Sequence, residues 1–168
     1  MYLMKHPTSA VAHLLPAAAL TVALWGVPAF ALARSGPFSD FAGPWFGAGR
    51  IYTANGAEPI RCRARYAVGN EGNLVRQTMV CASPSYRFSV DSTVRDHDGA
   101  VSGTWMETTR NIEGRIEGVA GDGRIEASIR GQSFTANLKL VTHGNTQAVT
   151  IVPQGTDVRE VTVRLRRG

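Results

Sequence analysis

The sequence predicts an all-β protein, an up-and-down (lipocalin-like) antiparallel barrel of about ten strands that follows an N-terminal signal peptide. Three observations predict this fold. From Gly43 onward, short runs rich in Val, Ile, Thr and aromatic residues alternate with turn residues every 8 to 14 positions. No stretch shows the 3.6-residue periodicity of an amphipathic helix. Pairing the runs across their turns keeps one face apolar throughout, as hairpins with one buried face require.

The first 33 residues have the features of a cleavable signal peptide. A short basic start at Lys5 and His6 precedes an apolar segment over 10–31, and Ala-x-Ala sequences end at Ala31 and Ala33. A retained membrane helix is the alternative, but two prolines and a glycine interrupt a run shorter than the roughly 20 residues needed to span a bilayer. We therefore predict a signal peptide over 1–33, a flexible lead-in over 34–42, one barrel domain over 43–168, and a periplasmic or secreted location.

The charge and the cysteines limit the function further. The formal net charge is +5, and the arginines are spaced singly along the chain rather than in a cluster, so we expect no nucleic-acid partner. Cys62 and Cys81 are the two cysteines, and in an exported chain they predict one disulfide. A reactive thiol or a metal site would need further partners that the sequence does not identify.

The first two hairpins define the inner face. A turn at Asn55-Gly56, a strong hairpin signal, opposes Ile51 to Ile60 and Trp45 to Tyr66. A four-residue loop over 70–73 then opposes Cys62 to Cys81 as a non-hydrogen-bonded pair, the class whose short Cβ separation suits a disulfide.

Seven further turns continue the pattern. They are predicted at Ser83-Pro84, 96–99, Arg110-Asn111, 121–123, Gly131-Gln132, His143-Gly144 and 153–157. The pairs they predict are Cys81–Tyr86, Val94–Val101, Trp105–Ile116, Gly118–Ile125, Ile129–Phe134, Leu138–Val149 and Ile151–Val161. Nine short connections make a meander, and closing it into a barrel removes the two exposed edges, whereas a sandwich would need longer crossings.

The opposite face carries most of the arginines, such as Arg61, Arg63 and Arg115. An outer-membrane barrel has the reverse arrangement, with apolar residues outside. The pattern therefore predicts a barrel with its core inside and no stable membrane insertion after signal cleavage. Oligomeric state is not indicated.

Candidate ligand-binding residues are those predicted to point inward with a polar group or a large aromatic ring: Tyr66, Gln77, Trp105, Glu107 and Gln147. Glu107 also lies at a strand end, where it would reach water, and inward aromatic rings are usually plain packing. Inward glycines either leave a cavity or let a narrow barrel close. No catalytic constellation, metal site or cofactor motif is present, so we expect a non-enzyme.

The segments 41–45, 60–66, 81–88 and 101–107 resemble a family of small exported α-proteobacterial proteins, which has no activity to carry over. Gly43-Pro44-Trp45 is similar to the G-x-W start of lipocalins, and that similarity implies a late-strand arginine, Arg164 or Arg166, on the Trp45 ring. The leading hypothesis is therefore a barrel that binds a small apolar ligand inside. The alternative is an envelope interaction or structural module with a solid core.

Overall fold

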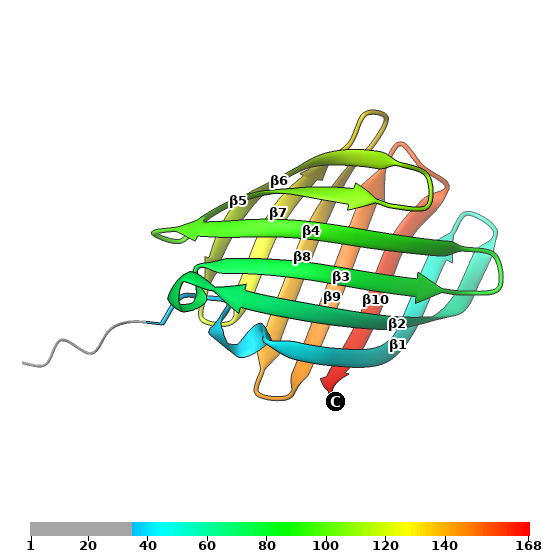
Figure 1. Ribbon diagram of the computed structural model, residues 1–168. Coiled ribbons are helices and arrows are strands. Elements are labelled where there is room, and N and C mark those ends of the chain that lie inside the picture. The colour runs from blue at the N-terminus through cyan, green and yellow to red at the C-terminus, as the bar shows by residue number, and fades with distance from the viewer. Residues whose placement is uncertain (1–34) are drawn as a thin grey trace, which may run out of the picture. The chain divides into compact units, whose positions relative to one another are not determined.

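A computed structural model describes residues 35–168, so the predicted signal peptide over 1–33 lies outside the described residues. A 3₁₀ helix, η1 (Ser39–Phe41), precedes ten strands, and a second 3₁₀ turn, η2 (Asn70–Gly72), joins β2 to β3 (Figure 1). The strands are β1 (Gly43–Thr53), β2 (Gly56–Gly69), β3 (Leu74–Ala82), β4 (Arg87–His97), β5 (Ala100–Glu107), β6 (Ile112–Gly121), β7 (Arg124–Arg130), β8 (Thr135–His143), β9 (Thr146–Gln154) and β10 (Val158–Arg167).

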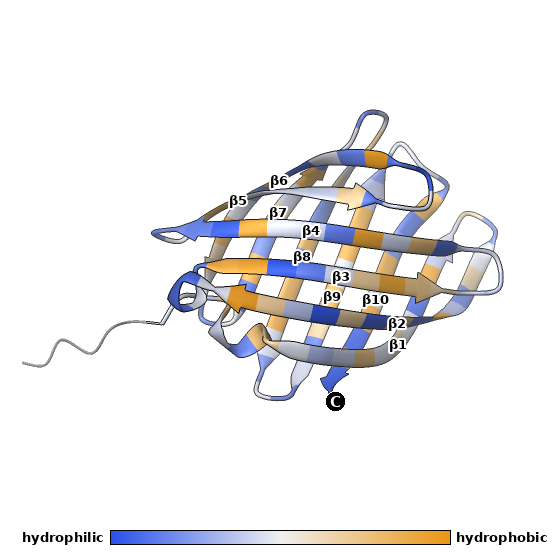
Figure 2. Cartoon of the chain, in the orientation of Figure 1, coloured by the Kyte–Doolittle hydropathy of each residue, from blue (hydrophilic) through white to orange (hydrophobic). Residues whose placement is uncertain are grey.

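The ten strands form a closed antiparallel barrel in which each strand pairs with its neighbours in sequence and β1 pairs with β10. This confirms the predicted up-and-down barrel. Hydropathy alternates along the strands (Figure 2), because successive side chains point to opposite faces. On β2, for example, Ile60, Cys62, Ala64 and Tyr66 are buried, while the arginines between them are exposed.

The predicted register is confirmed at two hairpins, where Cys62 faces Cys81 and Ile151 faces Val161. At the other seven hairpins the predicted partners are wrong by two residues, although the inward face is correct. The observed partners are Ile51–Glu58, Cys81–Phe88, Val94–Gly103, Trp105–Gly114, Gly118–Ala127, Ile129–Ala136 and Leu138–Ile151. The side-chain period is two, so a two-residue shift leaves the apolar pattern unchanged, and only the turn decides between such registers.

The turn between β4 and β5 shows why the predicted register was wrong by two residues. We predicted a four-residue loop over 96–99, but His97 pairs with Ala100, which leaves a two-residue turn at Asp98-Gly99. Both turn residues have positive φ, 53° and 87°, as a type I′ hairpin turn requires. At two other hairpins the error in loop length is the opposite. The predicted two-residue turns at Ser83-Pro84 and Gly131-Gln132 are parts of four-residue loops.

Inward glycines mark where the backbones of adjacent strands approach closely. A Cβ on Gly49 would lie 1.7 Å from the carbonyl oxygen of Thr162, and a Cβ on Gly47 would lie 1.9 Å from that of Arg164. Three more inward glycines have the same relationship to a neighbouring strand: Gly103, Gly114 and Gly118. A side chain at these positions would collide with the neighbouring strand, so glycine allows these strands to approach as closely as they do.

The segment before β1 is ordered over 36–41, in contrast to the flexible lead-in predicted over 34–42. The Gly36 amide donates to the Glu71 carbonyl (2.8 Å) and the Phe38 amide to the Gly72 carbonyl (3.0 Å). The side chains of Phe38 and Phe41 are almost fully buried in the core. Burying two phenylalanines contributes about 2 kcal/mol each, enough to hold this short segment against the barrel.

None of the helical segments within residues 35–168 has both the length and the apolar character needed to cross a membrane.

Candidate ligand-binding interior

One end of the barrel is sealed by η1 and the side chains around it. This is the end at which β1 begins and β10 finishes. Trp45 is fully buried there, and its indole Nε1 donates a hydrogen bond to the Phe41 carbonyl (2.7 Å). Tyr66 packs edge-on against both the Phe41 and Trp45 rings. The aromatic rings fill this end beside β1, β2 and β10.

Arg167 completes the seal from the last strand. Its guanidinium carbon lies 4.9 Å from the centre of the Trp45 ring, and its NH groups donate to the carbonyls of Asp40 and Ala42. The lipocalin resemblance implied Arg164 or Arg166 in this role, which is wrong. Both have even numbers on β10 and point outward, whereas Leu165 and Arg167 point inward.

A buried polar network lies beside the seal. The Tyr66 hydroxyl donates to Gln147 Oε1 (2.8 Å), and Gln147 Nε2 donates to Thr142 Oγ1 (3.1 Å). Burial raises the pKa of the Tyr66 phenol well above its ordinary value of 10.0, so the hydroxyl stays protonated and serves as a donor. The structure thus brings two of the predicted site residues, Tyr66 and Gln147, into direct contact, and their polar groups are bonded to one another.

Toward the other end of the barrel, some inward side chains are buried, among them Ile51, Ile60 and Trp105, and others are only partly buried. Apolar residues there pack against the core and yet keep part of their surface accessible: Met79, Tyr86, Phe88, Val90, Ile112, Ile129, Phe134, Leu138, Val149, Ile151 and Val158. Five of them lie in or beside the loops that connect the strands at this end: Tyr86, Phe88, Ile112, Phe134 and Val158. The second end therefore combines buried side chains with apolar ones that keep part of their surface accessible.

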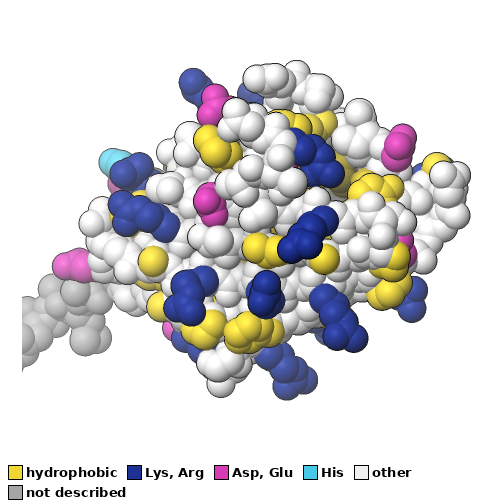
Figure 3. Space-filling view, turned by 45° about the vertical axis from the view of Figure 1, so that its right-hand side comes forward, with side chains coloured by type: hydrophobic (Ala, Val, Ile, Leu, Met, Phe, Trp, Pro, Cys, Tyr) yellow, Lys and Arg dark blue, Asp and Glu magenta, His cyan; other side chains and the backbone are white. Residues whose placement is uncertain are grey.

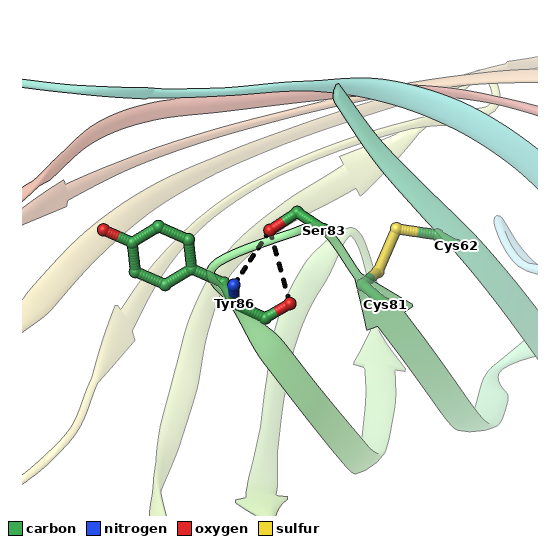
Figure 4. The surroundings of a disulfide bond; sticks show 4 residues. All are labelled: Cys62, Cys81, Ser83 and Tyr86. Atoms are coloured by element: carbon green, nitrogen blue, oxygen red, sulfur yellow. Dashed lines mark hydrogen bonds between the residues drawn. A yellow bond between two sulfur atoms is a disulfide. The ribbon is translucent and has the colours of Figure 1, made fainter. Parts of the chain in front are cut away.

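The disulfide confirmed between Cys62 and Cys81 braces the wall of this second half (Figure 4). Their Cα atoms are 4.1 Å apart, the short separation of a non-hydrogen-bonded pair, which was the pair class predicted from the 70–73 loop. Just beyond, Ser83 fixes the next loop: its hydroxyl accepts a hydrogen bond from the Tyr86 amide (3.0 Å) and donates to Glu58 Oε1 (2.5 Å).

Glu107 fixes a loop at the same end. Its carboxylate accepts hydrogen bonds from the backbone amides of Ser89 (3.1 Å), Thr109 (3.2 Å) and Arg110 (2.7 Å). Burial by itself raises the pKa of the carboxyl, but these hydrogen bonds outweigh it and hold the pKa below its ordinary value. The charge is thus neither free in the interior nor solvated at a strand end. It is held by backbone amides of β4 and of the 108–111 loop, with the Arg110 guanidinium 3.6 Å away.

Of the remaining predicted residues, Trp105 lies near the second end and Gln77 lies on β3. The Trp105 ring is 5.5 Å from that of Phe134, and its Nε1 donates to the Arg130 carbonyl (3.3 Å). Gln77 and Ser92 face each other on β3 and β4, with the Ser92 hydroxyl donating to Gln77 Oε1 (3.3 Å), and both keep partial exposure. Of the five predicted site residues, Gln77 is the one that is partly exposed rather than buried.

No family model and no curated protein matches this chain. The resemblance to a family of exported proteins therefore stays a prediction. Among the described residues, no three His, Cys, Asp or Glu side chains lie close enough together to hold a metal ion.

Sequence reasoning missed the elements of the seal. Phe38 and Phe41 were assigned to a flexible segment, although two phenylalanines three residues apart, directly before the first strand, are the signal that could have identified a plug. Thr142, the partner of Gln147, was not singled out because a threonine in a strand carries no distinguishing pattern.

Proposed function

We propose that this protein is an exported, non-enzymatic barrel that binds a small, mostly apolar ligand in the half of its interior remote from η1. One observation carries the proposal: a group of inward apolar side chains remote from η1 keeps part of its surface accessible, in contrast to the buried aromatic rings around Trp45. Ligand sites are typically concave, lined by apolar and aromatic side chains, and contain a few polar groups that fix orientation. Gln77 and Ser92 supply such groups midway along the barrel.

The expected ligand is an uncharged or singly polar molecule with a hydrocarbon body. Two carboxylates lie on the inward register of this half and both accept hydrogen bonds: Glu107 from three backbone amides, and Glu58 from the Ser83 hydroxyl and the Ser85 amide. Burying an ionised group of the ligand without a partner would cost several kcal/mol, at least about 3. The disulfide is typical of proteins from oxidising compartments and supports a periplasmic or secreted location.

Titration with a fluorescent fatty-acid probe, read at the emission of the probe, tests the proposal when it is run on two matched variants. Ile151 points inward and is partly accessible, whereas Val152, the next residue of β9, points outward and is 38% exposed. We expect the wild type and Val152→Trp to bind the probe equally, and Ile151→Trp, which fills the interior, to bind at least about tenfold more weakly.

Native mass spectrometry of the purified protein gives the second readout, since a bound molecule would add its mass. Wild-type protein that carries no added mass and binds no probe would overturn the proposal. So would equal probe binding by Ile151→Trp in a variant whose far-ultraviolet circular dichroism matches that of the wild type, because a bound ligand could then not lie inside.

A further inference from the structure

Six exposed arginines from three separate segments of the sequence lie together on the outer face of three adjacent strands. The barrel places β2 and β10 on either side of β1. The outward side chains of these strands form what we call the basic face, defined by Arg50, Arg61, Arg63, Arg65, Arg164 and Arg166. Figure 3 shows Lys and Arg side chains outweighing acidic ones over the lower part of the face turned to the viewer, where β1 and β2 lie.

The charge of the basic face is uncompensated. Together β1, β2 and β10 contain eight arginines and two acidic residues, whereas β4–β7 contain five arginines and six acidic residues. Within the part of the chain that the structure describes, the ion pairs of arginine and lysine involve Arg110, Arg124, Arg130 and Lys139 and none of the six. Such an excess on one side creates a positive potential that attracts anionic partners.

Exposed aromatic rings lie within this charge. Phe46 is 49% exposed and pairs directly with Arg63 on β2 and Arg166 on β10. Tyr52, further along β1, is 38% exposed on the same face. Moving a half-exposed phenylalanine among cations into a membrane interface costs no free energy. The ring enters the apolar side of the interface while the cations stay at its charged side.

A hollow of about 550 Å³ lies beside Phe46, between the outer faces of β1, β10 and β9. Arg164 and Arg166 form one wall, and the floor is made by the small side chains of Ala48 and Ala148. This shape provides room for a compact anionic group next to two guanidinium groups, which bind phosphate oxygens with two parallel hydrogen bonds.

We propose that the basic face docks the protein peripherally on a membrane surface that contains anionic phospholipids. The face is broad, with arginines in two rows on both sides of a central strand, and so fits an extended surface of phosphate groups. A single-stranded nucleic acid would instead require a narrow positive groove with aromatic rings in series for base stacking, and Phe46 and Tyr52 stand six residues apart. Each arginine near an anionic bilayer strengthens binding about fivefold.

Co-sedimentation with vesicles tests the proposal. We expect the wild type to bind vesicles of phosphatidylcholine with about 30% phosphatidylglycerol, to lose binding as salt is raised, and not to bind pure phosphatidylcholine. The double variant Arg63→Gln/Arg166→Gln removes both cations beside Phe46 and should bind more than tenfold more weakly. Its matched control, Arg95→Gln/Arg115→Gln, removes the same charge from exposed positions on β4 and β6 and should bind as the wild type does.

Three results would overturn the proposal. The first is no binding to the anionic vesicles by the wild type. The second is equal weakening by the two double variants, since binding would then depend on net charge alone. The third is tighter binding to a single-stranded oligonucleotide than to the vesicles, which would assign the face to nucleic acid. Probe binding in the interior does not depend on these arginines, so the two proposals can fail separately.

Discussion

The guanidinium of Arg167 lies over the indole ring of Trp45, 4.9 Å from its centre, and so joins the last strand of the barrel to the first. The same guanidinium donates to two carbonyls of the segment that contains η1, while Trp45 donates to a third. Arg167 and Trp45 therefore hold together β1, β10 and the segment that contains η1. The difference between the two ends of the barrel depends on this contact.

Arg167→Ala should lower the free energy of unfolding by about 2 kcal/mol, because it removes a cation–π contact and two hydrogen bonds. Arg166→Ala, which removes an outward arginine from the adjacent position, should change it by less than about 0.5 kcal/mol. Urea denaturation followed by tryptophan fluorescence measures both. Equal effects of the two substitutions would show that Arg167 does not hold β1 and β10 together.

Gly47→Ala and Gly49→Ala should each destabilise the barrel by at least about 3 kcal/mol or prevent folding, because the added Cβ would lie within 2 Å of a backbone oxygen of β10. Gly121→Ala is the control, because a Cβ there would have no atom within 4 Å. Thermal unfolding by circular dichroism would distinguish them. A melting temperature of Gly49→Ala like that of Gly121→Ala is incompatible with the close approach of β1 and β10.

Removing the disulfide with Cys62→Ala/Cys81→Ala should lower the free energy of unfolding by about 3 kcal/mol, the value expected for a closed loop of this length in the chain-entropy model. A reductant should destabilise the wild type and leave the double variant unaffected, and guanidinium denaturation with and without the reductant measures this. Thiol labelling of the denatured, non-reduced wild type should find no free cysteine. Two labelled thiols would refute the bridge.

Glu107 should make stability depend on acid pH. Its pKa is lowered in the folded state, so the stability it contributes is present above the ordinary value of 4.5 and is lost as pH falls through the folded pKa. Between about pH 5 and about pH 3, the stability of the wild type should therefore fall more steeply than that of Glu107→Gln.

At neutral pH, Glu107→Gln should be less stable than the wild type by about 1.5 kcal/mol, because its amide cannot accept three charge-assisted hydrogen bonds. Glu113→Gln, an exposed position on β6, is the control and should keep the wild-type pH profile. Parallel pH profiles of the wild type and Glu107→Gln would contradict the role given to the carboxylate.

Much of the fold could be predicted from the sequence because strand alternation is a local property. The inner face and the Cys62–Cys81 pair follow from alternation and from turn residues. The register could not be predicted at most hairpins, since registers two residues apart bury the same side chains. Turn geometry decides between them, as it does at Asp98-Gly99.

The candidate site depends on contacts between residues distant in sequence, and these the sequence does not specify. Tyr66 and Gln147 are 81 residues apart, and only the closed barrel brings them together. Likewise, Arg63 and Arg166 lie in separate segments of the chain, but the pairing of β1 with β2 and β10 places them on either side of Phe46. Closure, a property of the whole chain, creates both the seal and the basic face.

Thiol labelling in the folded state tests the central claim most directly, namely that the interior is accessible at the end opposite η1. The native cysteines are joined to each other, so a cysteine introduced at Ile151 or at Leu165 would be the one free thiol. Both residues point inward, but Ile151 is partly accessible in the open half, whereas Leu165 is 1% exposed beside the seal. We expect methyl methanethiosulfonate to modify Ile151→Cys at least about tenfold faster than Leu165→Cys under native conditions. Equal protection of the two thiols until the protein unfolds would show that the interior is filled.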